Sequence, residues 1–285
     1  MPDTPPPADA TEAANRLVEA MRMLPSVAVA LSGGVDSAVV AAAAVRALGR
    51  SAVALTAHSP SVSRRDRIDA AAVTHAVGIR QVVIETDEFA LPDYQANRGD
   101  RCYYCKSTLY DAMAAYAEAN GFATLCNGTN ADDLGDYRPG LRAASEFAVR
   151  QPLAELGYGK RTVREIAALW SLPIAEKPAS PCLSSRVAVG VAVTPELTAR
   201  IERAEECVRK IVGDGPLRVR VEVGDLARIE VPKSQLFRLV EQADTMTAAL
   251  RRDGFRAVTL DLEGFRSGSL NDLVPLHMRT AEASR

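Results

Sequence analysis

The sequence predicts an α/β fold, with a doubly wound parallel sheet followed by a smaller C-terminal α+β domain. Short apolar runs typical of buried strands alternate with helical patterns, which implies crossover connections and a sheet covered on both faces. The runs lie at 27–31, 51–57, 81–85 and 123–126. After residue 187 the pattern changes to alternating segments at 217–223 and 227–231, which are typical of antiparallel strands.

Helix boundaries follow from apolar spacing, capping residues, glycines and prolines. The expected helices span 11–24, 38–48, 63–77, 107–120, 160–170, 195–212 and 233–251. The chain of 285 residues is long enough for two modest domains. We expect a Pro-rich disordered tail at residues 1–10, a first domain at 11–187 and a second domain at 188–285.

Composition narrows the class of protein. The net charge is −2, so no basic excess points to a nucleic-acid partner. No apolar run approaches the roughly 18 residues of a membrane span, and the acidic, Pro-rich start does not resemble a signal peptide. We therefore expect a cytoplasmic protein with no nucleic-acid or membrane partner. Its five cysteines should act as thiols, metal ligands or reagents rather than disulfides.

A glycine-rich turn, S-G-G-V-D-S, joins the first strand to the next helix. Gly33 and Gly34 let backbone N–H groups turn towards one point, the helix aims its positive end there, and Ser32 and Ser37 add hydroxyl donors. These features predict a pocket for phosphate oxygens. The lysine of a Walker loop and the G-x-G-x-x-G fingerprint are both missing. Asp36 would repel a bare phosphate, so we expect it to act through Mg²⁺ or the helix N-terminus.

A long polar loop follows the fourth strand and is rich in carboxylates. One interpretation is a solvated loop. The other is a nucleotide and Mg²⁺ site that includes Gly128, with Asp132, Asp133 or Asp136 facing the ion and Arg138 facing a phosphate.

Cys102 and Cys105 form a C-x-x-C pair, and Cys182 lies in a later loop held open by two prolines. Redox disulfides, zinc sites and iron–sulfur sites all use C-x-x-C, and three unrelated cysteines are a further alternative. Three thiolates suit a [4Fe–4S] cluster whose open iron can hold an extra sulfide. Cys126 and Cys207, on an expected strand and helix, are interpreted as packing residues.

S-G-G-V-D-S resembles the pyrophosphate loop of the PP-loop ATP pyrophosphatases, which split ATP between the α- and β-phosphates and adenylate a substrate. Four further motifs extend the resemblance to the LarE family over nearly the whole chain. They are R-C-Y-Y-C-K, N-G-T-N-A-D-D-x-x-D-Y-R-P-G, K-P-A-S-P-C-L-S-S-R and R-V-R-V-E-V-G-D-L-A-R-I-E-V. The resemblance implies an adenine nucleotide alpha hydrolase-like sheet. LarE proteins are ATP-dependent sulfur transferases that help to make the nickel-pincer cofactor of lactate racemase.

By that resemblance the substrates are ATP, with Mg²⁺, and pyridinium-3,5-biscarboxylic acid mononucleotide. ATP adenylates a carboxylate, and sulfur then displaces AMP to give a thiocarboxylate. Cys182 matches the family cysteine that supplies sulfur, which one branch sacrifices as dehydroalanine. Cys102 and Cys105 match the other branch. We therefore expect all three to hold a [4Fe–4S] cluster that receives sulfur from sulfide or a delivery protein, with Cys182 not consumed.

The resemblance also implies roles in the C-terminal domain and a homo-oligomer. Arg218 and Arg220, on one face of a strand, are expected to bind the mononucleotide phosphate, and Arg186 the adenylate or the substrate acid. Glu206 and Glu230 are candidate ligands for a divalent metal. Two other carboxylates are equally available, Glu205 and Glu222.

Lys106 and Lys177 are candidates to stabilise the charge of departing pyrophosphate. Two alternatives stay open. One is a tRNA-thiolating or other PP-loop adenylating enzyme, and the other is a non-catalytic nucleotide-sensing or iron–sulfur module. Pyrophosphate release in the presence of the pyridinium substrate separates enzyme from module.

Overall fold

The computed structural model describes residues 9–135 and 139–266, which form two compact units. The first unit comprises Met1–Glu88 and Cys102–Lys177, and the second comprises Phe89–Arg101 and Pro178–Arg285. The division thus falls ten residues before the expected boundary at 187, and a segment from the middle of the first domain joins the second unit.

The sheet of the first unit contains four parallel strands in the order β3-β2-β1-β4. They are β1 (Val27–Ala30), β2 (Ala52–His58), β3 (Arg80–Glu85) and β4 (Thr124–Cys126). Successive residues of β1 enter different cores, because strand side chains alternate between faces. Val27 and Val29 belong to one apolar cluster, and Ala28 and Ala30 to another. The predicted α/β class with a parallel sheet is confirmed.

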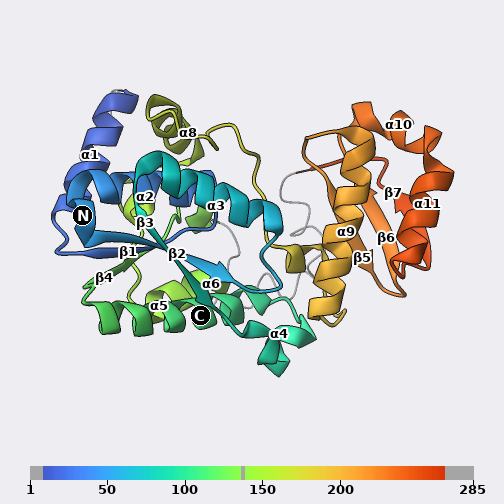
Figure 1. Cartoon of the computed structure of the whole chain (residues 1–285), viewed down its shortest axis with the longest axis horizontal. Helices are drawn as coiled ribbons and strands as arrows, with labels where there is room; N and C mark the ends of the chain where they lie inside the picture. The colour runs from blue at the N-terminus through green and yellow to red at the C-terminus, as the bar shows by residue number, and fades with distance from the viewer. Residues whose placement is uncertain (1–8, 136–138, 267–285) are drawn as a thin grey trace. The chain divides into compact units, whose positions relative to one another are not determined.

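Helices cover both faces of this sheet (Figure 1). Those packed in the first cluster are α1 (Ala10–Arg22), α2 (Val35–Leu48), α3 (Arg64–Val77) and α8 (Lys160–Leu169). The second cluster contains residues of α5 (Arg101–Asn120) and α6 (Pro139–Glu146). Short helical turns connect these elements: η1 (Gly49–Ser51), η3 (Ala131–Gly135) and α7 (Pro152–Glu155).

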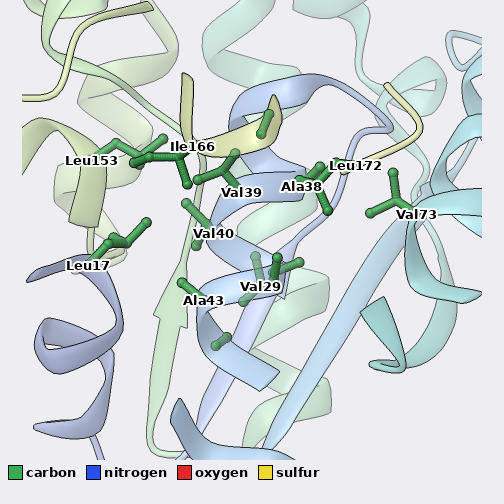
Figure 2. Close-up of a cluster of buried hydrophobic side chains, with 14 of the residues drawn as sticks. Leu17, Val29, Ala38, Val39, Val40, Ala43, Val73, Leu153, Ile166 and Leu172 are labelled. Atoms are coloured by element: carbon green, nitrogen blue, oxygen red, sulfur yellow. The ribbon is translucent and has the colours of Figure 1, made fainter. Parts of the chain in front are cut away.

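Helix α2 is buried along most of its length because its small side chains fit between neighbouring helices and the sheet. Figure 2 shows Val39 and Val40 of α2 in the first cluster, with Leu17 of α1 and Ile166 of α8. All four side chains are buried or nearly so. This packing fixes the N-terminus of α2, which begins directly after the glycine-rich turn.

The second unit is the predicted small α+β structure. Its sheet has the order β5-β6-β7, with β5 antiparallel to β6 and β7 parallel to β6. The strands are β5 (Arg218–Glu222), β6 (Leu226–Glu230) and β7 (Ala257–Leu260). The helices are α4 (Pro92–Ala96), η4 (Leu183–Arg186), α9 (Pro195–Val212), η5 (Lys233–Gln235), α10 (Leu236–Glu241) and α11 (Ala243–Arg252). The single helix predicted at 233–251 was wrong, since three shorter helices replace it.

The segment 89–101 belongs to the second unit because its side chains bond there. Asn97 adopts the left-handed conformation, and its Nδ2 donates to the carbonyls of Ala188 at 2.8 Å and Val191 at 3.1 Å. The buried hydroxyl of Tyr94 hydrogen-bonds that of Ser184 at 2.8 Å. These contacts join residues about ninety positions apart, so local sequence patterns do not reveal them.

Within residues 9–135 and 139–266, no helix combines the length and the apolar character needed to cross a membrane.

Candidate active site

The site of the first unit lies where the strand order reverses. Strands β2 and β3 lie on one side of β1, and β4 lies on the other. In open parallel sheets, ligands bind at such a switch point, beyond the carboxyl ends of the strands. The glycine-rich turn follows β1, and Asn127 and Gly128 follow β4, so both border this point.

The glycine-rich turn is held in one shape. Gly33 has φ +75°, and a Cβ there would lie 2.5 Å from the carbonyl oxygen of Asp66. The hydroxyl of Ser37 accepts from the N–H of Ser32 at 3.2 Å and donates to the carbonyl of Gly34 at 3.0 Å. The first N–H groups of a helix have no partner within it. The turn and the start of α2 therefore suit an anion, as predicted for phosphate.

Gly128 brings the segment after β4 onto this turn. A Cβ at Gly128 would lie 2.5 Å from the amide nitrogen of Ser37 and 2.8 Å from the carbonyl carbon of Asp36. Both atoms belong to the backbone, so only glycine fits without displacing the start of α2. The predicted phosphate turn and the polar loop after β4 therefore adjoin in the structure.

Asp36 connects the turn to two other elements. Its Oδ1 accepts from Nδ2 of Asn130 at 3.3 Å, and its Oδ2 pairs with Nζ of Lys160, the first residue of α8. The backbone N–H of Lys160 donates to Asp132 at 2.7 Å. Asp133 accepts from the N–H of Asn130 at 3.1 Å.

Mg²⁺ is commonly held by one or two carboxylates together with substrate phosphates. The chemistry of the donor set fits, because Asp36 offers a carboxylate at the N-terminus of α2 within the glycine-rich turn. Arg138 and Asp136, also expected at this site, lie outside the described residues.

Lys177 stabilises the glycine-rich turn. Its Nζ donates to the carbonyl of Gly33 at 3.1 Å and pairs with Asp66 at 2.8 Å and Asp69 at 2.6 Å. Burial lowers the pKa of Lys177, but the two carboxylates outweigh it and raise that pKa above its ordinary value of 10.5. With two carboxylates already bound, this ammonium positions the turn. Its predicted role towards pyrophosphate stays a prediction.

We expect Lys177→Met to lower the free energy of unfolding by about 3 kcal/mol at pH 7, because two carboxylates then lie together without their cation. A raised lysine pKa stabilises the fold fully below pH 10.5, and this contribution fades as pH rises through the folded-state value. The difference from wild type should thus be constant from neutral pH to about pH 10 and shrink above it. Urea titrations measure it, with the exposed Lys210→Met as control. A difference that grew at high pH would contradict this account.

Cys102 and Cys105 lie in the first turn of α5, so the predicted start of that helix after Lys106 was wrong. Three residues apart, they share one face of the helix. Cys102 is exposed and Cys105 partly exposed. Cys182 is partly exposed and belongs to the second unit. In the part of the chain that the structure describes, no three His, Cys, Asp or Glu side chains are gathered as a metal site. A shared cluster therefore stays a prediction.

The turn that carries Cys182 is fixed by a buried arginine. Arg186 donates to the carbonyls of Pro181 and of Cys182, the latter at 3.1 Å, and pairs with buried Glu205 at 2.8 Å. Glu205 also accepts from the N–H of Val219 at 3.2 Å, which ties the turn to β5. Arg186 thus positions the cysteine segment, and its expected contact with adenylate or substrate stays a prediction.

Arg218 and Arg220 are both buried on β5, so these two side chains do not form a solvated strand face. Arg220 is bound through two nitrogens by Glu230. Arg218 lies 3.8 Å from the same carboxylate and donates to the carbonyl of Arg266 at 3.2 Å. Burial, together with the nearby Arg220 and Arg186, lowers the pKa of Arg218 to about 10. A bound anion would compensate this charge.

Glu230 is 1% exposed and also accepts from Arg228 at 2.8 Å. It acts as counter-ion to arginines, which leaves little room for the metal role expected of it. Glu206 is half-exposed and lies 3.5 Å from Arg209. The metal role of this pair stays a prediction.

Burial raises the pKa of the Cys126 thiol to about 12 and also raises that of Cys207. Their interpretation as packing residues agrees with this, because neither is poised to form a thiolate.

Sequence reasoning missed Lys160, although one signal was available. A lysine at the first position of a helix faces the positive end of the helix dipole, which is unfavourable. A residue placed against that preference usually has a partner, and here it is Asp36.

Comparison with known proteins identifies the family of this chain. The sequence model of the NAD synthase family matches residues 11–129, which hold the glycine-rich turn. An uncharacterized protein of Synechocystis is 46% identical over 85% of this chain and 91% of its own length. A Lactiplantibacillus plantarum protein named pyridinium-3,5-bisthiocarboxylic acid mononucleotide synthase is 36% identical over 90% of this chain and 92% of its own. The similarity extends along almost the whole chain, and the candidate site contains a glycine-rich turn of PP-loop type. The protein therefore belongs to the LarE family.

Proposed function

We propose that this chain is a cytoplasmic ATP-dependent sulfur transferase. It adenylates a carboxylate of pyridinium-3,5-biscarboxylic acid mononucleotide and converts it to a thiocarboxylate. The observation that carries the proposal is the phosphate turn of Gly33, Gly34 and Ser37, closed against Gly128. The name of the Lactiplantibacillus relative supports the proposed identity of the substrate.

In the first half-reaction, a carboxylate oxygen of the substrate attacks the α-phosphorus of ATP. The bond from that phosphorus to the bridging oxygen breaks, and pyrophosphate leaves with the electron pair. In this proposal, backbone N–H groups at the start of α2 and the hydroxyl of Ser32 hold its oxygens. Asp36 would hold the Mg²⁺ that accompanies ATP.

In the second half-reaction, sulfur attacks the carbonyl carbon of the acyl adenylate and AMP leaves. AMP is a far better leaving group than a carboxylate oxygen, so ATP cleavage makes the substitution feasible. We propose that Cys102, Cys105 and Cys182 hold a [4Fe–4S] cluster, because three thiols form a soft donor set that matches iron. When bound, such a cluster would supply the sulfide that acts as nucleophile. Arg186 holds the turn of Cys182 in place.

Arg218 is the proposed ligand for the phosphate of the mononucleotide. Its guanidinium is buried, its nearest carboxylate is already bound by two other arginines, and its pKa is lowered. A dianionic phosphate would offset these costs through charge-assisted hydrogen bonds.

Anaerobic protein, reconstituted with iron and sulfide, tests the proposal. We expect pyrophosphate and AMP to form from ATP only when the pyridinium mononucleotide is present, together with a thiocarboxylate detected by mass spectrometry. The corresponding nucleoside, which lacks the phosphate, should react poorly. ATP binding without turnover would instead favour a nucleotide-sensing module.

Sulfide, free or from a delivery protein, is the proposed sulfur source, and a homo-oligomer the proposed assembly.

A further inference from the structure

Lys160 sits at the candidate ATP site with no role assigned to it so far. Its ammonium pairs with Asp36, which belongs to the glycine-rich turn and is the second residue of α2. The side chains of Lys160 and Asp36 are 34% and 22% exposed. The contact is therefore open to solvent and to ligands. Partly exposed ion pairs add little to stability, so holding the fold together does not explain a lysine at this unfavourable helix position.

Lys177 gives an internal comparison. Its side chain is only 18% exposed and contacts two carboxylates and a backbone carbonyl. Departure of that ammonium would leave two acids uncompensated. Among the residues that the structure describes, Lys160 has one carboxylate partner, so a single arriving cation can take its place. Of these two lysines beside the turn, only Lys160 can move at low cost.

We propose that Lys160 is a catalytic residue of adenylation, exchanging its contact with Asp36 for the β- and γ-phosphates of bound ATP. The Mg²⁺ that accompanies ATP compensates Asp36, so the lysine leaves no unpaired carboxylate behind. The ammonium then donates hydrogen bonds to the group that departs as pyrophosphate. Negative charge builds up there as the bond to the α-phosphorus breaks. No proton transfer is needed, since pyrophosphate leaves with the electron pair. This inference rests on the proposed function.

Nucleotide binding tests the proposal apart from turnover. The probes are AMP and α,β-methylene ATP, an ATP analogue that cannot be cleaved between its α- and β-phosphates. The binding of each probe is measured by calorimetric titration with Mg²⁺ present. We expect Lys160→Ala to lower the affinity for the analogue at least about tenfold, which is the effect of losing one charge-assisted hydrogen bond. AMP affinity should not change, because AMP lacks the β- and γ-phosphates. Lys160→Arg keeps the charge and should recover part of the loss.

Arg161→Ala is the matched control, because Arg161 follows Lys160 in α8 and its side chain is 91% exposed. It should bind both probes like wild type. Equal binding of the analogue by Lys160→Ala and wild type would overturn the proposal. A parallel loss of analogue and AMP would also overturn it, because it would show a merely structural role. If wild type itself bound neither probe, the proposed function would fail instead, so the two failures are distinguishable.

Discussion

Gly128→Ala should lower the rate of ATP use by about 100-fold while leaving a folded protein. The added methyl group would lie 2.5 Å from the amide nitrogen of Ser37 and 2.8 Å from the carbonyl carbon of Asp36. These are backbone atoms at the start of a helix buried among α1, α8 and the sheet, so they cannot yield as a flexible side chain would. Instead, the segment after β4 must move away from the phosphate turn. A displacement of about 1 Å at a reacting centre costs on the order of 100-fold in rate.

The measurement is pyrophosphate release at saturating and limiting ATP, with circular dichroism to confirm folding. Gly135→Ala is a matched control from the same polar loop. Among the described residues, no atom would lie within 4 Å of a Cβ at Gly135, and the φ of Gly135 is not positive. Its kcat/KM should stay within about twofold of wild type, since exposed substitutions away from special features are nearly neutral. Gly128→Ala activity above one-tenth of wild type would contradict the close approach described here.

The sequence predicted the first unit well because its signals are local. Ser63 accepts a hydrogen bond from the N–H of Asp66, and Gly78 ends α3 in the left-handed conformation, both as their residue types indicate. The glycine-rich turn likewise combines a buried strand, two glycines and a helix within eleven residues. Each of these features depends on neighbours in the chain, so no tertiary information is needed.

The rest depended on contacts between distant residues. Lys160 meets Asp36 across 124 positions, and Lys177 meets Gly33 across 144. A local sequence pattern does not indicate with which carboxylate a lysine forms an ion pair. The unit boundary was displaced for the same reason, because Asn97 bonds carbonyls more than ninety residues later. The role of Glu230, an expected metal ligand, was equally hard to predict. Arg220 on the neighbouring strand pairs with Glu230, and this pairing follows only once the register of β5 and β6 is known.

Cys182→Ser should separate the two half-reactions. A serine hydroxyl preserves the size of the side chain, and the turn is held through the backbone carbonyl of residue 182 and by Arg186 and Glu205. Pyrophosphate release should therefore stay within a few-fold of wild type. Thiocarboxylate formation should fall by at least about 10³-fold, a loss of roughly 4 kcal/mol in transition-state stabilisation, because hydroxyl oxygen is a poor ligand for a soft iron–sulfur centre.

The iron content decides how the sulfur is carried. If the three cysteines share a cluster, Cys102→Ser, Cys105→Ser and Cys182→Ser should each lower the iron and sulfide bound after anaerobic reconstitution. Cys207→Ser should not, because that thiol lies on α9 with its pKa raised by burial. Wild-type protein after turnover should keep its mass, since a cluster that accepts external sulfide leaves Cys182 intact. Loss of one sulfur per chain from Cys182 without bound iron would show instead that this thiol is consumed, and Cys102 and Cys105 would then need another role.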